Sequence, residues 1–358
     1  MAEGAQEKTM KRILLIISCA VLAIGVSGGP LMMRLYFLDG GHRVWLPSFL
    51  EACGFPIILI PLSIAYIRRR RSAAATQSTK IKLMLMEPPL FFAFVVIGLI
   101  TGLNNFFFAF GVSRLPVTTS SLILATQLAF NALFSFLLVR QKFRAYSVNT
   151  IVLLTIAAGV LAMHSTGDRP AGESNKQYAM GFALTVLAAV LEGFILPVVE
   201  LAYKKVKQTI CYSTVLEAQF IMCMFASFIG ITGMIVTNDF KSISKEARQF
   251  DHGEVVYYTV LAGTALLYQC FFVGAIGVVF CASSLLSGVI VAAFLPVTEV
   301  LAVIFFKEKF NAEKGVALIL SLWGFVSYFY GEIKQAKKMK KNVTLEAEIP
   351  QVLPIPNP

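Results

Sequence analysis

Long apolar runs, separated by short polar segments, dominate the sequence. Ten of them come close to the roughly 20 residues that an α-helix needs to cross a bilayer. We expect spanning helices near residues 12–33, 44–66, 88–111, 116–139, 147–165, 179–202, 212–236, 254–277, 279–306 and 314–331. Runs of this length do not fit the short alternating strands of an outer-membrane barrel. The pattern therefore predicts an all-α membrane protein with ten transmembrane helices.

The distribution of charge supports this interpretation. Charged residues make up 14% of the 358-residue chain, against roughly 25% in a soluble domain. None of the 31 Lys and Arg residues lies in the interior of an apolar run. If the N-terminus is cytoplasmic, most of these basic residues lie on the cytoplasmic side, as the positive-inside rule requires. Membrane topology, rather than nucleic-acid binding, thus explains the net charge of +11, and both termini are predicted to be cytoplasmic.

The chain also repeats itself. A shift of 167 residues aligns Pro30 with Pro197 and Lys142-Phe143 with Lys309-Phe310. Each half then holds five spans, and an odd number of spans inverts the second half relative to the first. Inverted repeats of this kind build transporters whose binding site lies near the membrane midplane, between the halves.

We therefore expect two inverted five-helix repeats around a central cavity. The first repeat covers residues 1–166 and the second covers 179–331, with a polar inter-repeat loop at 167–178. A disordered cytoplasmic tail is expected at 332–358 because this segment is rich in Lys and then in Pro. Within the first repeat, Gly98-x-x-x-Gly102 is typical of close packing between membrane helices.

Amide side chains mark helix faces that point away from lipid. Ser120, Gln127 and Asn131 are spaced at i, i+7 and i+11, which places them on one helical face. Asn104 and Asn105 lie together in the preceding run. An amide in the bilayer core is costly unless it is paired, so these faces should point inward. The amides either line a substrate cavity or pair with one another between helices, and the sequence leaves both open.

The same side chains suggest what such a cavity binds. Asn or Gln presents a donor and an acceptor side by side, which complements the N6 amino group and N7 of adenine. Aromatic rings nearby can stack on a flat heterocycle. Besides the four amides, the candidate substrate contacts are Glu192, Tyr268, Gln269 and Thr298.

Two glutamates lie deep in apolar runs, Glu192 near Pro197 and Glu299 near Pro296. A carboxyl group at bilayer depth is costly and usually marks a substrate or proton path. Each of the two could bind and release a proton, accept a hydrogen bond from the substrate, or be satisfied by a neighbouring hydroxyl or amide. Glutamates nearer the run ends are expected at the membrane interface: Glu51, Glu200 and Glu217.

Motifs of enzyme chemistry are missing from the sequence. There is no metalloprotease helix motif, no phosphate-binding loop, no dinucleotide fingerprint and no nucleophile elbow. The six cysteines show no metal-binding spacing. We therefore expect that the protein is not an enzyme and binds no cofactor or metal. We expect a proton gradient to supply the energy for transport.

Several stretches are highly specific: Gly-Gly-Pro-Leu at 28–31, Leu-Pro-Val-Thr-Thr-Ser-Ser-Leu at 115–122, Gln-Leu-Ala-Phe-Asn-Ala at 127–132, Phe-Lys-Glu-Lys-Phe at 306–310 and Leu-Trp-Gly-Phe-Val-Ser-Tyr at 322–328. Through them the chain resembles, over nearly its whole length, the plant purine permease family of the drug/metabolite transporter superfamily. The resemblance implies ten helices, a cavity between the halves, and proton-coupled uptake of adenine, cytokinins and related alkaloids at the plasma membrane. It also marks one departure, because many members carry Asp-Asn where this chain has Asn104-Asn105. If that Asp binds the proton in them, Glu192 is the first candidate here and Glu299 the second.

The leading interpretation is a proton-coupled importer of adenine and purine derivatives such as cytokinins. The sequence does not rank these against other small heterocycles such as pyridoxine. An exchanger of nucleotide sugars or phosphates would need Lys or Arg inside the cavity to bind the anion. A non-transporting receptor would be expected to have a large extramembrane domain. The sequence shows neither pattern. The expected partners are the substrate, protons and membrane lipid, and a homodimer stays open.

Overall fold

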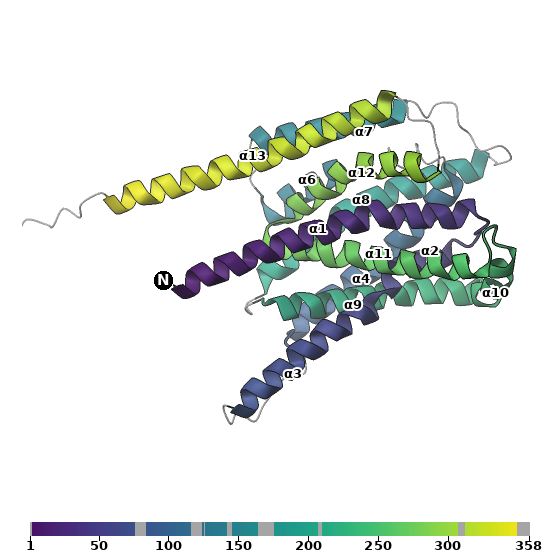
Figure 1. The fold of residues 1–358 in the computed structure, drawn as a ribbon, viewed down its shortest axis with the longest axis horizontal. Helices are drawn as coiled ribbons and strands as arrows, with labels where there is room; N and C mark the ends of the chain where they lie inside the picture. Colours follow the sequence, from purple (N-terminus) through teal and green to yellow (C-terminus); the bar gives the residue numbers. More distant parts are fainter. Residues whose placement is uncertain are drawn as a thin grey trace, which may run out of the picture.

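The computed structural model describes residues 2–75, 84–115, 124, 126–141, 145–163, 175–206, 210–306 and 312–348. These residues form helices and connecting segments, with no strand among them. The helices are α1 (Ala2–Leu38), α2 (Trp45–Cys53), η1 (Phe55–Ile58), α3 (Leu59–Ala75), α4 (Pro88–Arg114), α6 (Gln127–Val139), α7 (Ala145–Met163), α8 (Asn175–Lys205), α9 (Tyr212–Val236), α10 (Asp239–Gln249), α11 (Glu254–Cys281), α12 (Ser284–Phe306) and α13 (Ala312–Glu348). Most of the long helices run along the horizontal axis of Figure 1. The predicted all-helical class is thus confirmed for the described residues.

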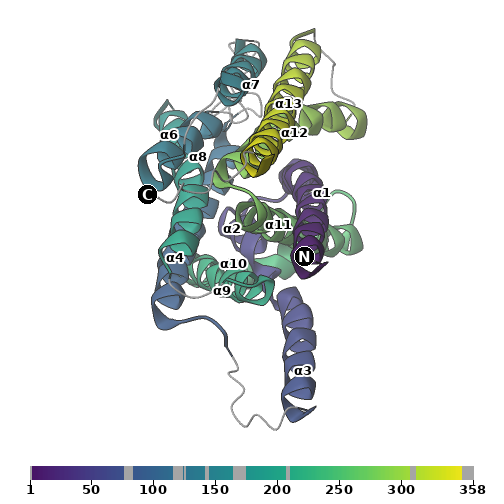
Figure 2. The ribbon, with the colours of Figure 1, turned by 90° about the vertical axis from the view of Figure 1, so that its left-hand side faces the viewer.

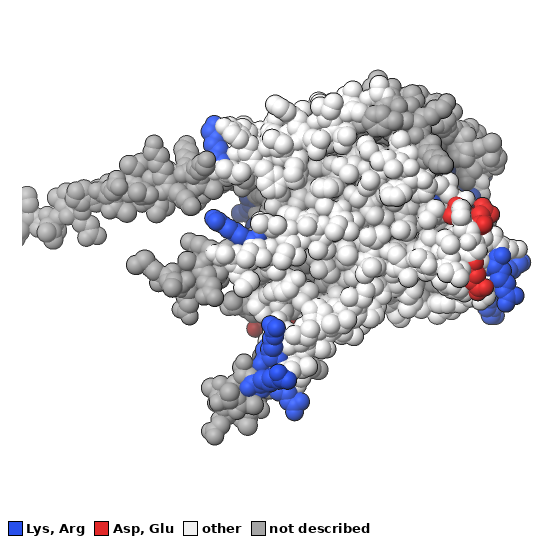
Figure 3. Space-filling view, in the orientation of Figure 1, with Lys and Arg blue, Asp and Glu red and all other residues white. Residues whose placement is uncertain are grey.

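Among the described residues, seven helical segments are long and apolar enough to cross a membrane: Thr9–Leu38, Trp45–Arg71, Pro88–Arg114, Ala179–Lys205, Tyr212–Val236, Glu254–Cys281 and Ser284–Phe306. Shorter apolar helices overlap the other three predicted spans, at Gln127–Val139, Ala145–Ala157 and Gly315–Gly331. On the face shown in Figure 3, charged side chains gather at the two ends and leave an uncharged belt between them. The chain is therefore a multi-pass membrane protein, and the count of ten spans stays a prediction.

The second span is broken rather than continuous. α2 ends at Cys53, the 3-10 turn η1 follows, and α3 begins at Leu59. Pro56 lies in this turn and has no backbone N–H to continue the α-helical hydrogen bonds. Beyond the break α3 leaves the bundle, as both ribbon views show (Figures 1 and 2).

Two polar segments contain helix where the sequence predicts none. The polar segment between the predicted spans 212–236 and 254–277 contains α10. α13 continues to Glu348, well beyond the boundary at 332 where we expected a disordered tail. This extension is rich in Lys, Glu and Ala, which are good helix formers. The rest of the predicted tail, 349–358, lies outside the described residues.

Glycines permit the close contact between α4 and α9. Gly98 and Gly102 both face α9, and a Cβ atom added to Gly102 would lie 2.8 Å from the carbonyl oxygen of Ala226. Only a residue without a side chain fits at that separation. The close packing predicted from the Gly-x-x-x-Gly spacing is confirmed.

The main packing partners come from opposite halves of the sequence. α1 packs against α11, α4 against α8 and α9, α6 against α8, and α7 against α13. Figure 2 shows α7 and α13 together at the edge of the bundle. In the α1–α11 pair, Gly25 of α1 faces the backbone of Phe271, and Gly274 of α11 faces the backbone of Leu22. The two halves of the chain are thus interleaved around the centre.

Candidate substrate site

A cavity lies at the centre of the bundle, between helices of both halves. It holds about 650 Å³ of space free of protein atoms, its open mouth included. The described residues that line it are Gly25, Val26, Pro30, Glu51, Asn104, Asn105, Phe108, Leu124, Gln127, Ala188, Glu192, Tyr268, Phe271, Phe272, Val291 and Leu295. Most of this lining is apolar, and six of its side chains carry amide, carboxyl or phenol groups.

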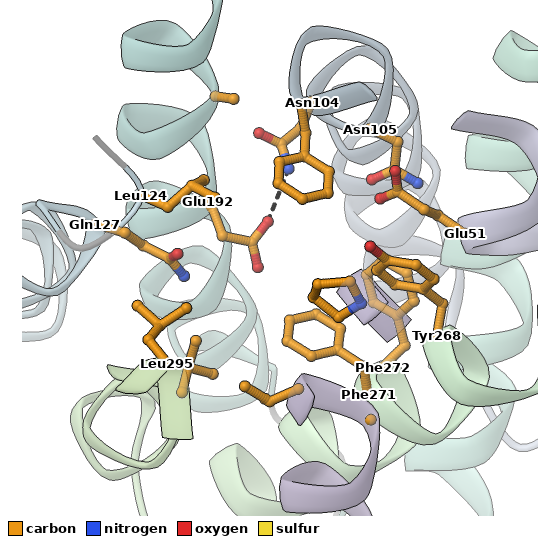
Figure 4. A pocket seen from close by; sticks show the side chains of 16 residues that line it. Glu51, Asn104, Asn105, Leu124, Gln127, Glu192, Tyr268, Phe271, Phe272 and Leu295 are labelled. Atoms are coloured by element: carbon orange, nitrogen blue, oxygen red, sulfur yellow. Dashed lines mark hydrogen bonds between the residues drawn. The ribbon is translucent and has the colours of Figure 1, made fainter. Parts of the chain in front are cut away.

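One polar group of the cavity consists of Asn104 (α4), Gln127 (α6) and Glu192 (α8), which we call the Glu192 wall. Asn104 Nδ2 donates a 2.8 Å hydrogen bond to Glu192 Oε2. Asn104 Oδ1 is buried and has no partner among the described residues. Figure 4 shows Gln127 and Glu192 on the same side of the central space. Three of the residues predicted to contact substrate are thus brought together by three different helices.

The close approach of α6 and α8 depends on the residue that follows Glu192. A Cβ atom added to Gly193 would lie 2.7 Å from Phe130 Cβ and 2.9 Å from the backbone nitrogen of Asn131. The glycine therefore lets the first turn of α6, which carries Gln127, pack directly on the turn of α8 that carries Glu192.

The opposite side of the cavity carries Glu51 (α2), Asn105 (α4) and Tyr268 (α11), which we call the Glu51 wall. All three side chains are buried, and Glu51 is only 4% exposed. Glu51 was expected at the membrane interface, but α2 is packed by α4, α9 and α11, which enclose it. The signal that could have identified it is an acid inside an apolar run, three residues before the Gly54-Phe55-Pro56 break.

Glu200 and Glu217 differ from the two cavity glutamates because both are paired. Glu200 accepts a 2.7 Å hydrogen bond from the backbone nitrogen of Ser284 and lies 2.8 Å from Lys204 Nζ. Glu217 accepts hydrogen bonds of 2.8 and 3.0 Å from the backbone nitrogens of Leu85 and Met86. These carboxylates satisfy backbone donors at or just before the first turns of α12 and α4, which is a structural role.

Two further predicted contacts do not line the cavity. Asn131 Nδ2 donates a 3.1 Å hydrogen bond to the carbonyl oxygen of Ser284, and Asn131 Oδ1 accepts one of 3.3 Å from Ser135 Oγ. Thr298 Oγ1 donates a 3.0 Å hydrogen bond to the carbonyl oxygen of Phe294, one turn earlier. Each of the two interpretations of these amides therefore holds for one residue. Gln127 faces the cavity, whereas Asn131 pairs between helices and joins α6 to α12.

The remaining candidates lie outside the cavity lining or outside the described residues. Gln269 is buried, and it faces Gly54, the residue after α2, where an added Cβ atom would lie 2.8 Å from Gln269 Cβ. Its side chain is absent from the cavity lining. Ser120 and the side chain of Glu299, which belongs to α12, lie outside the described residues.

The cavity suits a flat, uncharged ligand with polar edges. Its described lining includes no Lys, Arg or His, so the negative charge of a phosphate would meet no cation there. Phe108, Phe271 and Phe272 offer ring surfaces for stacking. The two polar walls offer donors and acceptors to the edges of such a ligand.

Comparison with known proteins identifies the family. The family model described as purine nucleobase transmembrane transport matches residues 13–338. The chain belongs to the purine permease family. Purine permease 3 of Arabidopsis thaliana is 52% identical over 332 residues, which cover 93% of this chain and 94% of that protein. Purine permease 2 of the same plant is 51% identical over 352 residues, covering 95% of this chain and 98% of that one.

The family resemblance predicted from the sequence is therefore confirmed, and purine permeases are transporters rather than enzymes. A crystal structure with 13% sequence identity has a TM-score of 0.58, covering 88% of this chain and 98% of its own. At that identity the likeness concerns the fold alone. In this purine permease, Asn104 is the residue that donates a hydrogen bond to Glu192.

Proposed function

We propose that this chain is a proton-coupled transporter that imports purine nucleobases, adenine among them, and purine derivatives such as cytokinins across the plasma membrane. The observation that carries this proposal is the Glu192 wall, where two amides and a carboxyl group face a cavity with aromatic sides. Adenine places its N6 amino donor next to the N7 acceptor, and the donor and acceptor of one amide complement that pair. Phe108, Phe271 and Phe272 supply ring surface for the purine plane.

The packing supports two inverted repeats around this site. We take α1 and α8 as the first spans of the two repeats, and α4 and α11 as their third spans. The α1–α11 and α4–α8 contacts are then equivalent, because each joins the first span of one repeat to the third span of the other. All four of these helices contribute residues to the cavity. Inverted-repeat transporters bind substrate at such a position between the halves.

Proton coupling is assigned to Glu192. Its carboxyl group faces the cavity and is hydrogen-bonded to a neutral amide, and no basic residue is among the described lining residues to hold it ionised. A carboxyl group in such surroundings can take up a proton at the acidic side and release it at the cytoplasmic side.

Charge distribution supports cytoplasmic termini. In Figure 3 the visible Lys and Arg side chains predominate at the end where the N-terminus of α1 lies, whereas both signs of charge appear at the α10 end. An excess of basic residues marks the cytoplasmic side of a membrane protein.

Uptake of labelled adenine by cells that lack their own nucleobase carrier tests the proposal. We expect accumulation above the external concentration, faster uptake at lower external pH, and loss of accumulation with a protonophore. Unlabelled cytokinins should compete, and phosphorylated nucleotides should not. Absence of adenine uptake by protein that reaches the surface, or competition by nucleotides, would overturn the proposal.

A further inference from the structure

The Glu51 wall carries polar atoms that nothing in the described protein satisfies. Glu51 Oε1 and Asn105 Nδ2 are both buried and lack hydrogen-bond partners. Tyr268, 6% exposed, has only a weak partner, since its hydroxyl lies 3.9 Å from Met33 Sδ. All three side chains line the cavity, on the side opposite Glu192 in Figure 4.

Buried polar groups in proteins are nearly always paired, and an unpaired one costs free energy. Glu200 and Glu217 follow this rule in the same protein, because backbone N–H groups and nearby basic side chains satisfy them. Glu51 differs in that its free oxygen belongs to a side chain lining a cavity. An acceptor and a donor left free in one cavity wall indicate a ligand that brings a donor and an acceptor.

We propose that Glu51 and Asn105 bind the N9–H and N3 edge of the purine, opposite the edge that the Glu192 wall binds. A carboxyl oxygen accepts a hydrogen bond and an amide N–H donates one, so the pair complements the N9–H donor and the neighbouring N3 acceptor of a free purine base. This inference rests on the proposed function and extends it, since the cavity then binds both edges of the base.

A consequence is selection for purines that are unsubstituted at N9. A methyl or sugar group at N9 removes the N–H donor and places carbon against the Glu51 carboxyl group, which stays buried without a partner. Substituents on the N6 amino group lie at the other edge and leave these two hydrogen bonds intact. The Glu51 wall therefore excludes nucleosides while admitting N6-substituted bases.

The first test uses the unaltered full-length protein. Uptake of labelled adenine is measured in the presence of unlabelled adenine, 9-methyladenine or 3-deazaadenine as competitor. We expect 9-methyladenine and 3-deazaadenine each to compete about tenfold or more less well than adenine, because each loses one hydrogen bond to the Glu51 wall. Competition by 9-methyladenine at the level of adenine would overturn the inference while leaving adenine transport established. Absence of adenine uptake would overturn the proposed function and this inference together.

The second test changes the protein. In Glu51→Ala we expect adenine to compete about tenfold less well and 9-methyladenine to be unaffected, so that the preference for the unsubstituted base disappears. Glu217→Gln, a buried glutamate outside the cavity, is the control and should keep the preference. If Glu51→Ala weakens both competitors equally, Glu51 has only a structural role and the inference is wrong. If that variant does not reach the surface, Glu51→Leu provides the same comparison at nearly the original volume, and the result with unaltered protein decides independently.

Discussion

Glu192→Gln should separate proton coupling from substrate binding. The substitution removes the titratable group and keeps an oxygen that can accept the hydrogen bond donated by Asn104 Nδ2, which is 2.8 Å long. A hydrogen bond to a charged acceptor contributes about 1.5–3 kcal/mol and a neutral one about 0.5–1.5 kcal/mol. Matching ends of these ranges differ by about 1–1.5 kcal/mol, so the exchange should weaken the Asn104 contact, and adenine binding through it, by roughly tenfold.

The effect on accumulation should be much larger. One proton moving down a pH difference of about one unit releases about 1.4 kcal/mol, and a potential of about 100 mV adds about 2.3 kcal/mol. Together they allow roughly 500-fold accumulation of an uncharged substrate, since each 1.4 kcal/mol is a factor of about ten. A carrier without the proton site can only equilibrate adenine, at a ratio of about one.

Proteoliposomes with an imposed pH gradient and potential measure both quantities. We expect Glu192→Gln to exchange labelled for unlabelled adenine across the membrane and to fail to concentrate it. Glu217→Gln, which changes a buried carboxylate outside the cavity, should concentrate adenine normally. If Glu192→Gln accumulates adenine with unchanged pH dependence, the proton is carried elsewhere, and Glu299→Gln faces the same assay.

Three shorter predictions follow from other parts of the structure. Gln127→Ala should raise the apparent KM for adenine about tenfold by removing an amide from the cavity, whereas Asn131→Ala should lower the amount of folded protein without raising KM; equal KM in Gln127→Ala and unaltered protein would move the site elsewhere. Gly102→Leu should destabilise the α4–α9 contact by about 1–3 kcal/mol or more, seen as a lower Tm in detergent, and Leu103→Ala on the exposed side of α4 should not. Tags placed before residue 1 and after residue 358 should bind antibody only in permeabilised cells, and staining of intact cells would reject the topology.

The apolar runs predicted the long helices well because length and composition decide whether a segment can cross a bilayer. The runs starting at 88, 179, 212 and 254 begin where the candidate spans begin. The break in the second span was missed, although Gly54 and Pro56 mark it. A single proline in an apolar run does not say whether the helix kinks, breaks or continues.

Candidate site residues were harder to predict because lipid and protein interior are both apolar. A spanning helix therefore lacks the contrast between a polar and an apolar face, which in a soluble protein indicates the side of a helix that packs against the core. Asn131 and Gln127 share one predicted face, yet Gln127 faces the cavity and Asn131 pairs with α12. The position of Glu51 near the end of an apolar run was also a poor guide to its burial. Glu51 is buried because other helices pack around α2, and the sequence of α2 alone does not show which helices these are.

The contact between α1 and α11 determines which parts of this protein can move. At Gly25 and Gly274 each helix lies against the backbone of the other, so neither can slide or roll without driving main-chain atoms together. We expect the two helices to move as one rigid body, although one belongs to the first half of the chain and the other to the second. Rearrangements that expose the cavity first to one side of the membrane and then to the other are then expected where this body meets α2, α8, α9 and α12. We therefore expect a moving unit that combines helices from both predicted repeats.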